Sequence, residues 1–131
     1  KDALDIDFSE VDIDYIDIVS AGNDCIDLSK GNYKLNKLNL LNCGDKALSV
    51  GEKSFLQLNE IIAEKSIIGI STKDSSIVTV ENINIKGSKR CLETKRKKQE
   101  FSGGILNIKN LNCHNSIISN EIGSFINREN V

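Results

Sequence analysis

Acidic side chains are concentrated at the start of the chain and offer the oxygen ligands that a hard cation prefers. Nine of the first 30 residues are acidic and two are basic. Asp5 and Asp27 are 22 residues apart, a spacing that recurs along the chain. If this spacing stacks them, their carboxylates lie about 5 Å apart and repel unless a cation or a backbone N–H relieves them. Asp5 and Asp27, with Asp2, Asp7 and Asp24 close by, are therefore candidate Ca²⁺ ligands. Solvated acids that accept bonds from turn amides are the alternative.

Basic side chains form a second group, between residues 86 and 98, where seven Lys and Arg residues accompany one Glu. The candidate binding residues of this segment are Lys95, Arg96, Lys97, Lys98 and Phe101. A cationic segment beside one aromatic ring suits an anionic polysaccharide or an acidic partner. Nucleic-acid binders usually carry more aromatic residues, so nucleic acid is not expected. A solvated loop without a ligand is the other interpretation.

A repeat of 22 residues indicates how these side chains are positioned. The order small, aliphatic, polar, then aliphatic or Thr recurs at residues 3–6, 25–28, 47–50, 69–72 and 91–94. A second pattern places one extra residue between two alternating apolar segments, and its copies begin at Val11, Tyr33, Leu56, Val78 and Leu106. The last copy arrives six residues late, because Leu106 follows Val78 by 28 residues. We therefore expect a basic loop to protrude at residues 95–104.

Alternation over short segments predicts β-strands, and repetition at a fixed period predicts that they stack. A single coil cannot bury its apolar face, whereas coils stacked about 4.8 Å apart bring equivalent side chains into contact. The chain contains no proline, which fits interior strands that must donate every N–H group. We expect an all-β parallel β-helix with about 22 residues per coil, five to six coils and three short strands per coil. The two-residue alternation excludes an α-helical solenoid.

Two segments resemble a known group of proteins. Residues 20–29 (SAGNDCIDLS) and 44–54 (GDKALSVGEKS) are similar to right-handed parallel β-helix proteins of the pectin-lyase-like superfamily. The resemblance implies a right-handed coil, which the period does not show. The superfamily includes polysaccharide lyases, hydrolases and epimerases, phage tailspikes and bacterial surface modules, and the last of these are the most similar.

The resemblance also implies where an enzyme of this superfamily would place its chemistry. A basic residue acts beside carboxylates or Ca²⁺ on the outward face of one strand stack. In this chain Lys73 and Lys95 would be the basic groups, and Asp5 and Asp27 the cation ligands. Lys73 is expected roughly 10 Å from Asp27, which exceeds the reach of direct proton transfer. A non-catalytic role is therefore favoured, and enzymatic activity stays open.

The four cysteines and the single histidine give little chemical signal. Cys25 and Cys91 share a repeat position but are expected three coils, or about 14 Å, apart. Cys43 and Cys113 belong to different positions and coils, and the cysteine spacings fit no zinc site. We therefore expect buried free thiols, and a surface turn at His114.

We expect residues 1–131 to be one β-helix domain from a longer chain, with further coils or a partner chain at its N-terminal end. The expected function is a non-catalytic module that presents a rigid surface to an acidic polysaccharide or another protein, within a bacterial surface-associated protein. The alternatives are a polysaccharide lyase or epimerase on an acidic polysaccharide and a structural assembly element. Ca²⁺ is the one cofactor considered, and an extracellular or cell-surface location is favoured. No apolar run approaches the ~20 residues of a membrane span.

Overall fold

The computed structural model describes residues 1–114 and 116–129, and this part of the chain is all β. The strands are β1 (Leu4–Asp7), β2 (Glu10–Ile18), β3 (Ile26–Ser29), β4 (Asn32–Leu41), β5 (Lys46–Gly51), β6 (Phe55–Lys73), β7 (Ile77–Lys95), β8 (Ile105–His114), β9 (Ile117–Asn120) and β10 (Phe125–Arg128). Within the described residues there is no helix long and apolar enough to cross a membrane.

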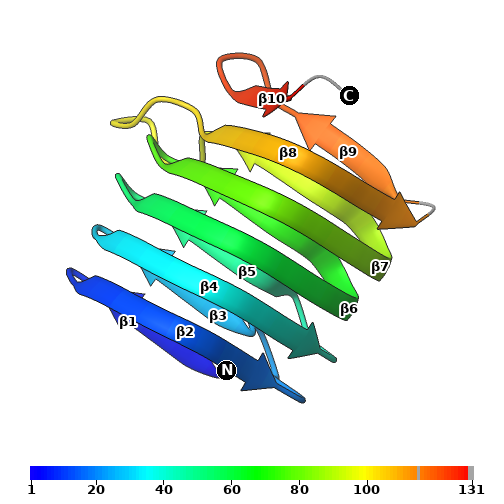
Figure 1. The fold of residues 1–131 in the computed structure, drawn as a ribbon. Helices are drawn as coiled ribbons and strands as arrows, with labels where there is room; N and C mark the ends of the chain where they lie inside the picture. The colour runs from blue at the N-terminus through cyan, green and yellow to red at the C-terminus, as the bar shows by residue number, and fades with distance from the viewer. Residues whose placement is uncertain (115, 130–131) are drawn as a thin grey trace.

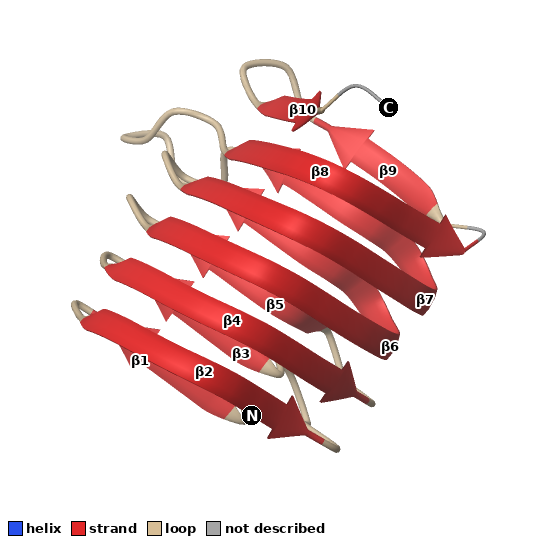
Figure 2. Cartoon of the chain, viewed as in Figure 1, coloured by secondary structure: helices blue, strands red, loops and turns tan. Residues whose placement is uncertain are grey.

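The strands form a parallel β-solenoid of about six turns. Every strand pairing is parallel, and equivalent residues of successive coils are about 22 positions apart, as in the row Leu4, Ile26, Leu48, Ile70 and Leu92. Figure 2 shows two layers, with the long strands in front and the short ones behind. In Figure 1 the front strands run from left to right and the rear strands return while the chain rises, so the coil is right-handed. The repeat therefore predicted the fold, the period and the register. It did not predict the strands within a coil, because one short and one long strand, as in β1 with β2 and β3 with β4, take the place of the three short strands expected.

The longer strand of each coil contains both of the alternating segments seen in the sequence. Pairing between β2 and β4 is continuous except at Asp14 and Asn36, which fall between the two segments. The same interruption separates Asn36 from Asn59 and Asn59 from Glu81. The one extra residue in the sequence pattern thus marks a break in the ladder within one strand. β6 and β7 then continue through the next corner into the short strand of the following coil.

The core consists of inward-facing aliphatic columns between the two layers. Leu28, Leu48, Ile70 and Leu92 are completely buried, as are Leu38 and Ile61 opposite them on the long strands. Burial of each such side chain stabilises the fold by about 1.5–3 kcal/mol. The inward residues of the first coil, including Leu4 and Ile13, are only partly buried and pack against the core from one side. The middle coils therefore carry the largest share of apolar burial.

The expectation of four free thiols is wrong, because the chain forms two disulfides. Cys25 is bonded to Cys43 with a Cα–Cα distance of 5.3 Å, and Cys91 to Cys113 with 5.9 Å. The repeat gives the distance between coils for residues of one column. It gives no distance across the interior, where residues of different columns face each other. Each disulfide joins two such columns near a corner of the coil.

Candidate polymer-binding surface

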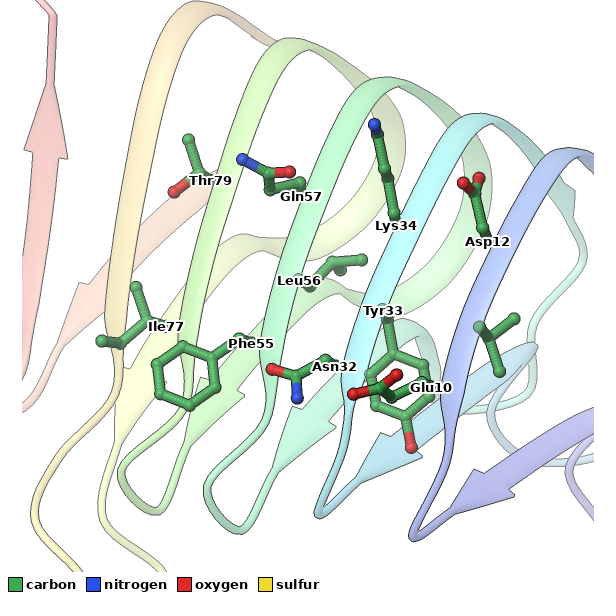
Figure 3. A pocket seen from close by; sticks show the side chains of 11 residues that line it. Glu10, Asp12, Asn32, Tyr33, Lys34, Phe55, Leu56, Gln57, Ile77 and Thr79 are labelled. Carbon is green, nitrogen blue, oxygen red and sulfur yellow. The ribbon is translucent and has the colours of Figure 1, made fainter.

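A groove lies on the outer face of the long strands, across β2, β4, β6 and β7 (Figure 3). Its volume is about 800 Å³. The side chains that line it are Glu10, Val11, Asp12, Asn32, Tyr33, Lys34, Phe55, Leu56, Gln57, Ile77 and Thr79. Strand alternation explains this lining, because residues next to buried core positions must point outward. Phe55 and Gln57, for example, flank the buried Leu56.

Two outward columns run along this face parallel to the solenoid axis. The first, which we call the aromatic column, contains Glu10, Asn32, Phe55, Ile77, Ile105 and Phe125. The second, the polar column, contains Asp12, Lys34, Gln57, Thr79, Asn107 and Asn127. Parallel pairing spaces the members of each column about 4.8 Å apart. The face therefore offers one side chain from each column per coil, and from the second coil on the aromatic column presents an amide or an apolar group.

Two smaller hollows extend the groove along the polar column. One of about 180 Å³ shares Asp12, Lys34, Gln57 and Thr79 with the main groove. The other, of about 310 Å³, begins at Thr79 and reaches Asn127 and Glu129. We call the three hollows together the axial groove. Because they share lining residues, the axial groove extends from the first coil to the last.

A fourth hollow, the corner pocket, opens where the short strands pass into the long ones. It has a volume of about 450 Å³ and is lined by Phe8, Lys30, Gly31, Asn32, Glu52, Lys53, Phe55 and Phe101. Asn32 and Phe55 belong to both the corner pocket and the axial groove. The two cavities are therefore continuous.

All four phenylalanines of the chain lie at the surface along this side of the molecule. The exposed fractions of Phe8, Phe55 and Phe125 are 72%, 51% and 57%, and Phe101 is partly exposed. Isolated exposed apolar residues are normal, whereas exposed rings that gather around a cavity are typical of a binding surface. Phe8, Phe55 and Phe101 gather in this way around the corner pocket.

Only part of the basic loop (residues 95–104) contributes to this surface. Phe101 lines the corner pocket, and the Lys98 ammonium forms an ion pair with Glu52 in the same pocket. Asp74 is buried, and its Oδ1 accepts the backbone N–H groups of Lys97 and Lys98 at 2.7 and 2.9 Å, which fixes the base of the loop. Figure 1 shows the loop projecting beyond the neighbouring turns.

Of the five predicted binding residues, Phe101 lines the corner pocket, whereas Lys95, Arg96, Lys97 and Lys98 are not part of its lining. Lys95 ends β7 on the outer face of the short strands, where its Nζ lies 3.4 Å from Glu93 Oε2. The Arg96 backbone N–H donates to Glu121 at 3.2 Å. Sequence reasoning missed Phe8, Lys30, Glu52 and Lys53, because each belongs to a turn whose equivalents carry no shared residue type. Gly31 after Lys30 and Gly51 before Glu52 were the available sequence signal, because glycine marks turns.

The acidic cluster differs from the predicted pair of Asp5 and Asp27. Carboxylate oxygens of Asp2, Asp24 and Asp27 lie within 4.8 Å of one another. Asp5 pairs with Asp27 in the strand register, but it is not a member of this group. Burial raises the pKa of Asp27 to about 6, although the Lys73 charge acts in the opposite direction. Burial also raises the pKa of Asp24.

Lys73 lies closer to the acids than strand positions alone suggest. Its side chain passes over Gly51, where an added Cβ would approach Lys73 Cε to 3.1 Å, and its Nζ donates to Ser49 Oγ at 2.9 Å. Ser49 pairs directly with Asp27 in the adjacent coil. Burial lowers the pKa of Lys73, and the neighbouring Lys46 charge adds to this effect. The separation of roughly 10 Å expected between Lys73 and Asp27 was a distance between strand positions. It did not include the length of the lysine side chain.

Comparisons with known protein families, with curated proteins and with solved structures find no match. The class of protein is therefore defined by its geometry, as a disulfide-linked parallel β-solenoid with a continuous groove along one face.

Proposed function

We propose that this chain is a binding module that holds an extended polysaccharide lengthwise in the axial groove. The observation that carries the proposal is that adjoining hollows follow two outward columns from the first coil to the last, with one side chain from each column in every coil. A linear polymer can repeat the same contact from coil to coil. A small ligand would leave most of these contacts unused.

The chemistry of the lining suits sugar rings. Sugars have apolar faces that pack on aromatic rings and hydroxyl groups that exchange hydrogen bonds with amides. Neighbouring amides already order one another, since Asn59 donates to Asn36 at 2.6 Å and Asn127 donates to Asn107 at 2.9 Å. Side chains that are ordered before binding lose less conformational entropy when the ligand arrives. The stacked coils thus supply a preorganised surface.

The proposal includes an exported, surface-associated protein of the pectin-lyase-like type, of bacterial origin, as the setting of the module. Two disulfides support an oxidising compartment, because structural disulfides persist there and are rare in the cytosol. The solenoid fold and the sequence resemblance support the superfamily.

The experiment compares polysaccharide binding by two variants that remove aromatic rings of equal exposure. Phe55 lines both cavities and is 51% exposed, whereas Tyr15 is 50% exposed and lies outside them. We expect Phe55→Ala to weaken binding about tenfold or more in affinity electrophoresis or calorimetry, because about 1.5–3 kcal/mol of ring burial is lost. Tyr15→Ala should bind like wild type. Equal loss in both variants, or no binding to a broad panel of polysaccharides, would refute the proposal.

A lyase acting on an acidic polysaccharide is the second candidate, favoured by Lys73. Its lowered pKa and its hydrogen bond to Ser49, which pairs with Asp27 in the next coil, suit a general base. The test is the ultraviolet absorbance of unsaturated products from acidic polysaccharides with Ca²⁺ present. Activity that Lys73→Gln abolishes would support the enzyme, and its absence at high protein concentration would exclude it.

A further inference from the structure

Glu52 occupies the centre of a group of lysines at the corner pocket. Its Oε2 lies 3.1 Å from Lys30 Nζ, and its Oε1 pairs with Lys98 of the basic loop. The Glu52 side chain is only 14% exposed, although both lysines are considerably more open. These two ion pairs hold the pKa of Glu52 below its usual value. One carboxylate thus bridges two coils and the loop.

The pocket retains positive charge after this pairing. Lys53 also lines it, with its Nζ 6.0 Å from the Phe101 ring centroid, and no carboxylate lies within ion-pair distance of Lys53 in the described residues. Lys30 Nζ lies 4.5 Å from the Phe8 ring centroid. Three lysines therefore surround one acid, and two of them stand over aromatic rings. Excess cationic charge in a hollow attracts anionic ligands.

The backbone fixes where the Glu52 carboxylate lies. Glu52 and Lys53 have φ values of 44° and 57°, a left-handed pair that makes the sharp turn between β5 and β6. The Glu52 carbonyl accepts the Lys30 N–H at 2.9 Å. The basic loop is anchored independently by Asp74, so it can keep its place when Lys98 releases Glu52.

We propose that the corner pocket is a subsite for the carboxylate or sulfate group of a charged sugar, and that Glu52 occupies the place of that anion until ligand binds. This inference rests on the proposed function, because the sugar belongs to the chain held in the axial groove. The ligand anion replaces Glu52 as the ion-pair partner of Lys30 and Lys98. The sugar ring packs against Phe8, Phe55 and Phe101. Glu52 thereby discriminates against weakly charged ligands that cannot displace it.

The experiment replaces the Glu52 carboxylate, which occupies the proposed anion position, and measures the binding of three probes. These are an oligogalacturonate with carboxylates, a heparin oligosaccharide with sulfates and a neutral cello-oligosaccharide. We expect Glu52→Gln to raise affinity for at least one charged probe about 3- to 10-fold and to leave neutral binding unchanged. Lys98→Ala should lower affinity for that same probe. The preferred probe identifies which anion the pocket takes.

The matched control is Glu60→Gln. Glu60 also pairs with a lysine, Lys37, at 3.5 Å on an exposed surface, and it lines neither cavity. This variant changes net charge equally and should leave all three affinities unchanged. Thermal unfolding of each variant verifies that it is folded.

The outcomes separate the two proposals. If Glu52→Gln weakens or does not change binding of the charged probes, or if Glu60→Gln has the same effect, the anion subsite is refuted. Wild-type binding of the neutral probe alone, lost in Phe55→Ala, would refute the subsite and support the groove. Absence of any polysaccharide binding would refute the proposed function itself.

Discussion

Single side chains on the outer face of the short strands show how a solenoid concentrates charge. Asp27 lies beside Asp2 and Asp24, and the Lys73 side chain extends toward it along the face. Stacking at about 4.8 Å leaves little room for water between equivalent groups, so each charge is partly desolvated. Burial accordingly raises the pKa of Asp24 and Asp27 and lowers the pKa of Lys73.

Asp27→Asn tests this desolvation through the pH dependence of stability. The folded-state pKa of Asp27 is raised from 3.8 to about 6, so the folded chain holds its proton more tightly than the unfolded chain. The resulting stabilisation is complete below about pH 4 and is lost as pH rises through about 6. Asp27→Asn should therefore be more stable at pH 7, by about 1 kcal/mol after solvent screening, with a flatter profile between pH 4 and 7. Thermal unfolding across this range measures the effect, and coincident profiles would contradict it.

The residue scale also shows where sequence reasoning succeeds and where it stops. The 22-residue spacing predicted that Asp5 stacks on Asp27, because register depends on backbone pairing alone. It also placed Asp2 and Asp24 near this pair, but it did not predict that their oxygens gather with Asp27 and leave Asp5 out, because the repeat does not specify the shape of the turn. It also did not predict the contact between Lys73 and Ser49, which depends on a flexible side chain and on the space above Gly51.

At the scale of elements, strand stacking gives inward residues very different degrees of burial. Leu48, on β5, is completely buried between two neighbouring coils. Ile13, on β2, contacts a neighbouring coil on one side and is only partly buried. Each element is thus stabilised mainly by the coils directly above and below it.

Truncation of these two residues should have unequal costs. We expect Leu48→Ala to reduce the free energy of unfolding by about 2–5 kcal/mol, because it leaves a cavity between fixed neighbours. Ile13→Ala should cost considerably less, because part of its side chain is already exposed to water. Urea unfolding followed by circular dichroism gives both values. Equal losses would contradict the burial gradient along the stack.

The Cys25–Cys43 disulfide connects the residues that flank β3 and β4, two strands that no ladder joins directly, whereas Cys91–Cys113 joins β7 and β8, which are already paired. Cys25 and Cys43 close a loop of 18 residues between the start of β3 and the end of β4. Cross-linking a loop of this length stabilises a fold by about 3 kcal/mol, mainly by restricting the unfolded chain. Reduction, or the double change Cys25→Ser and Cys43→Ser, should therefore lower Tm by several degrees at neutral pH. An unchanged Tm after complete reduction would contradict this structural role.

The fold was more predictable than the binding surface, because the two depend on different kinds of contact. The repeat specifies which residues face inward, and it predicted the buried Leu28, Leu48 and Leu92. Contacts across the interior, such as the pairing of Cys91 with Cys113, depend on the cross-section of the coil. The corner pocket depends on left-handed turns at Glu52 and Lys53, which neither residue type favours.

For the whole molecule, the two layers divide structural and surface roles. Inward columns pack against each other and set the spacing of the coils, while outward columns form the axial groove. Acidic residues are concentrated in the first coils, and the basic loop follows β7 in the sequence but reaches back to Glu52 through Lys98 and to the corner pocket through Phe101. Positive charge of the loop is therefore placed at the corner of the coils, beside one end of the axial groove.

The alternation of inward and outward residues has a consequence for how such a surface can change. Asn32 and Lys34 occupy the same two outward columns as Phe55 and Gln57 of the next coil. A pair of outward side chains can therefore change in one coil without altering the interior. Duplication of a whole coil would add one member to each outward column. The outward side chains of a solenoid can therefore change coil by coil, while the inward side chains that determine the fold stay the same.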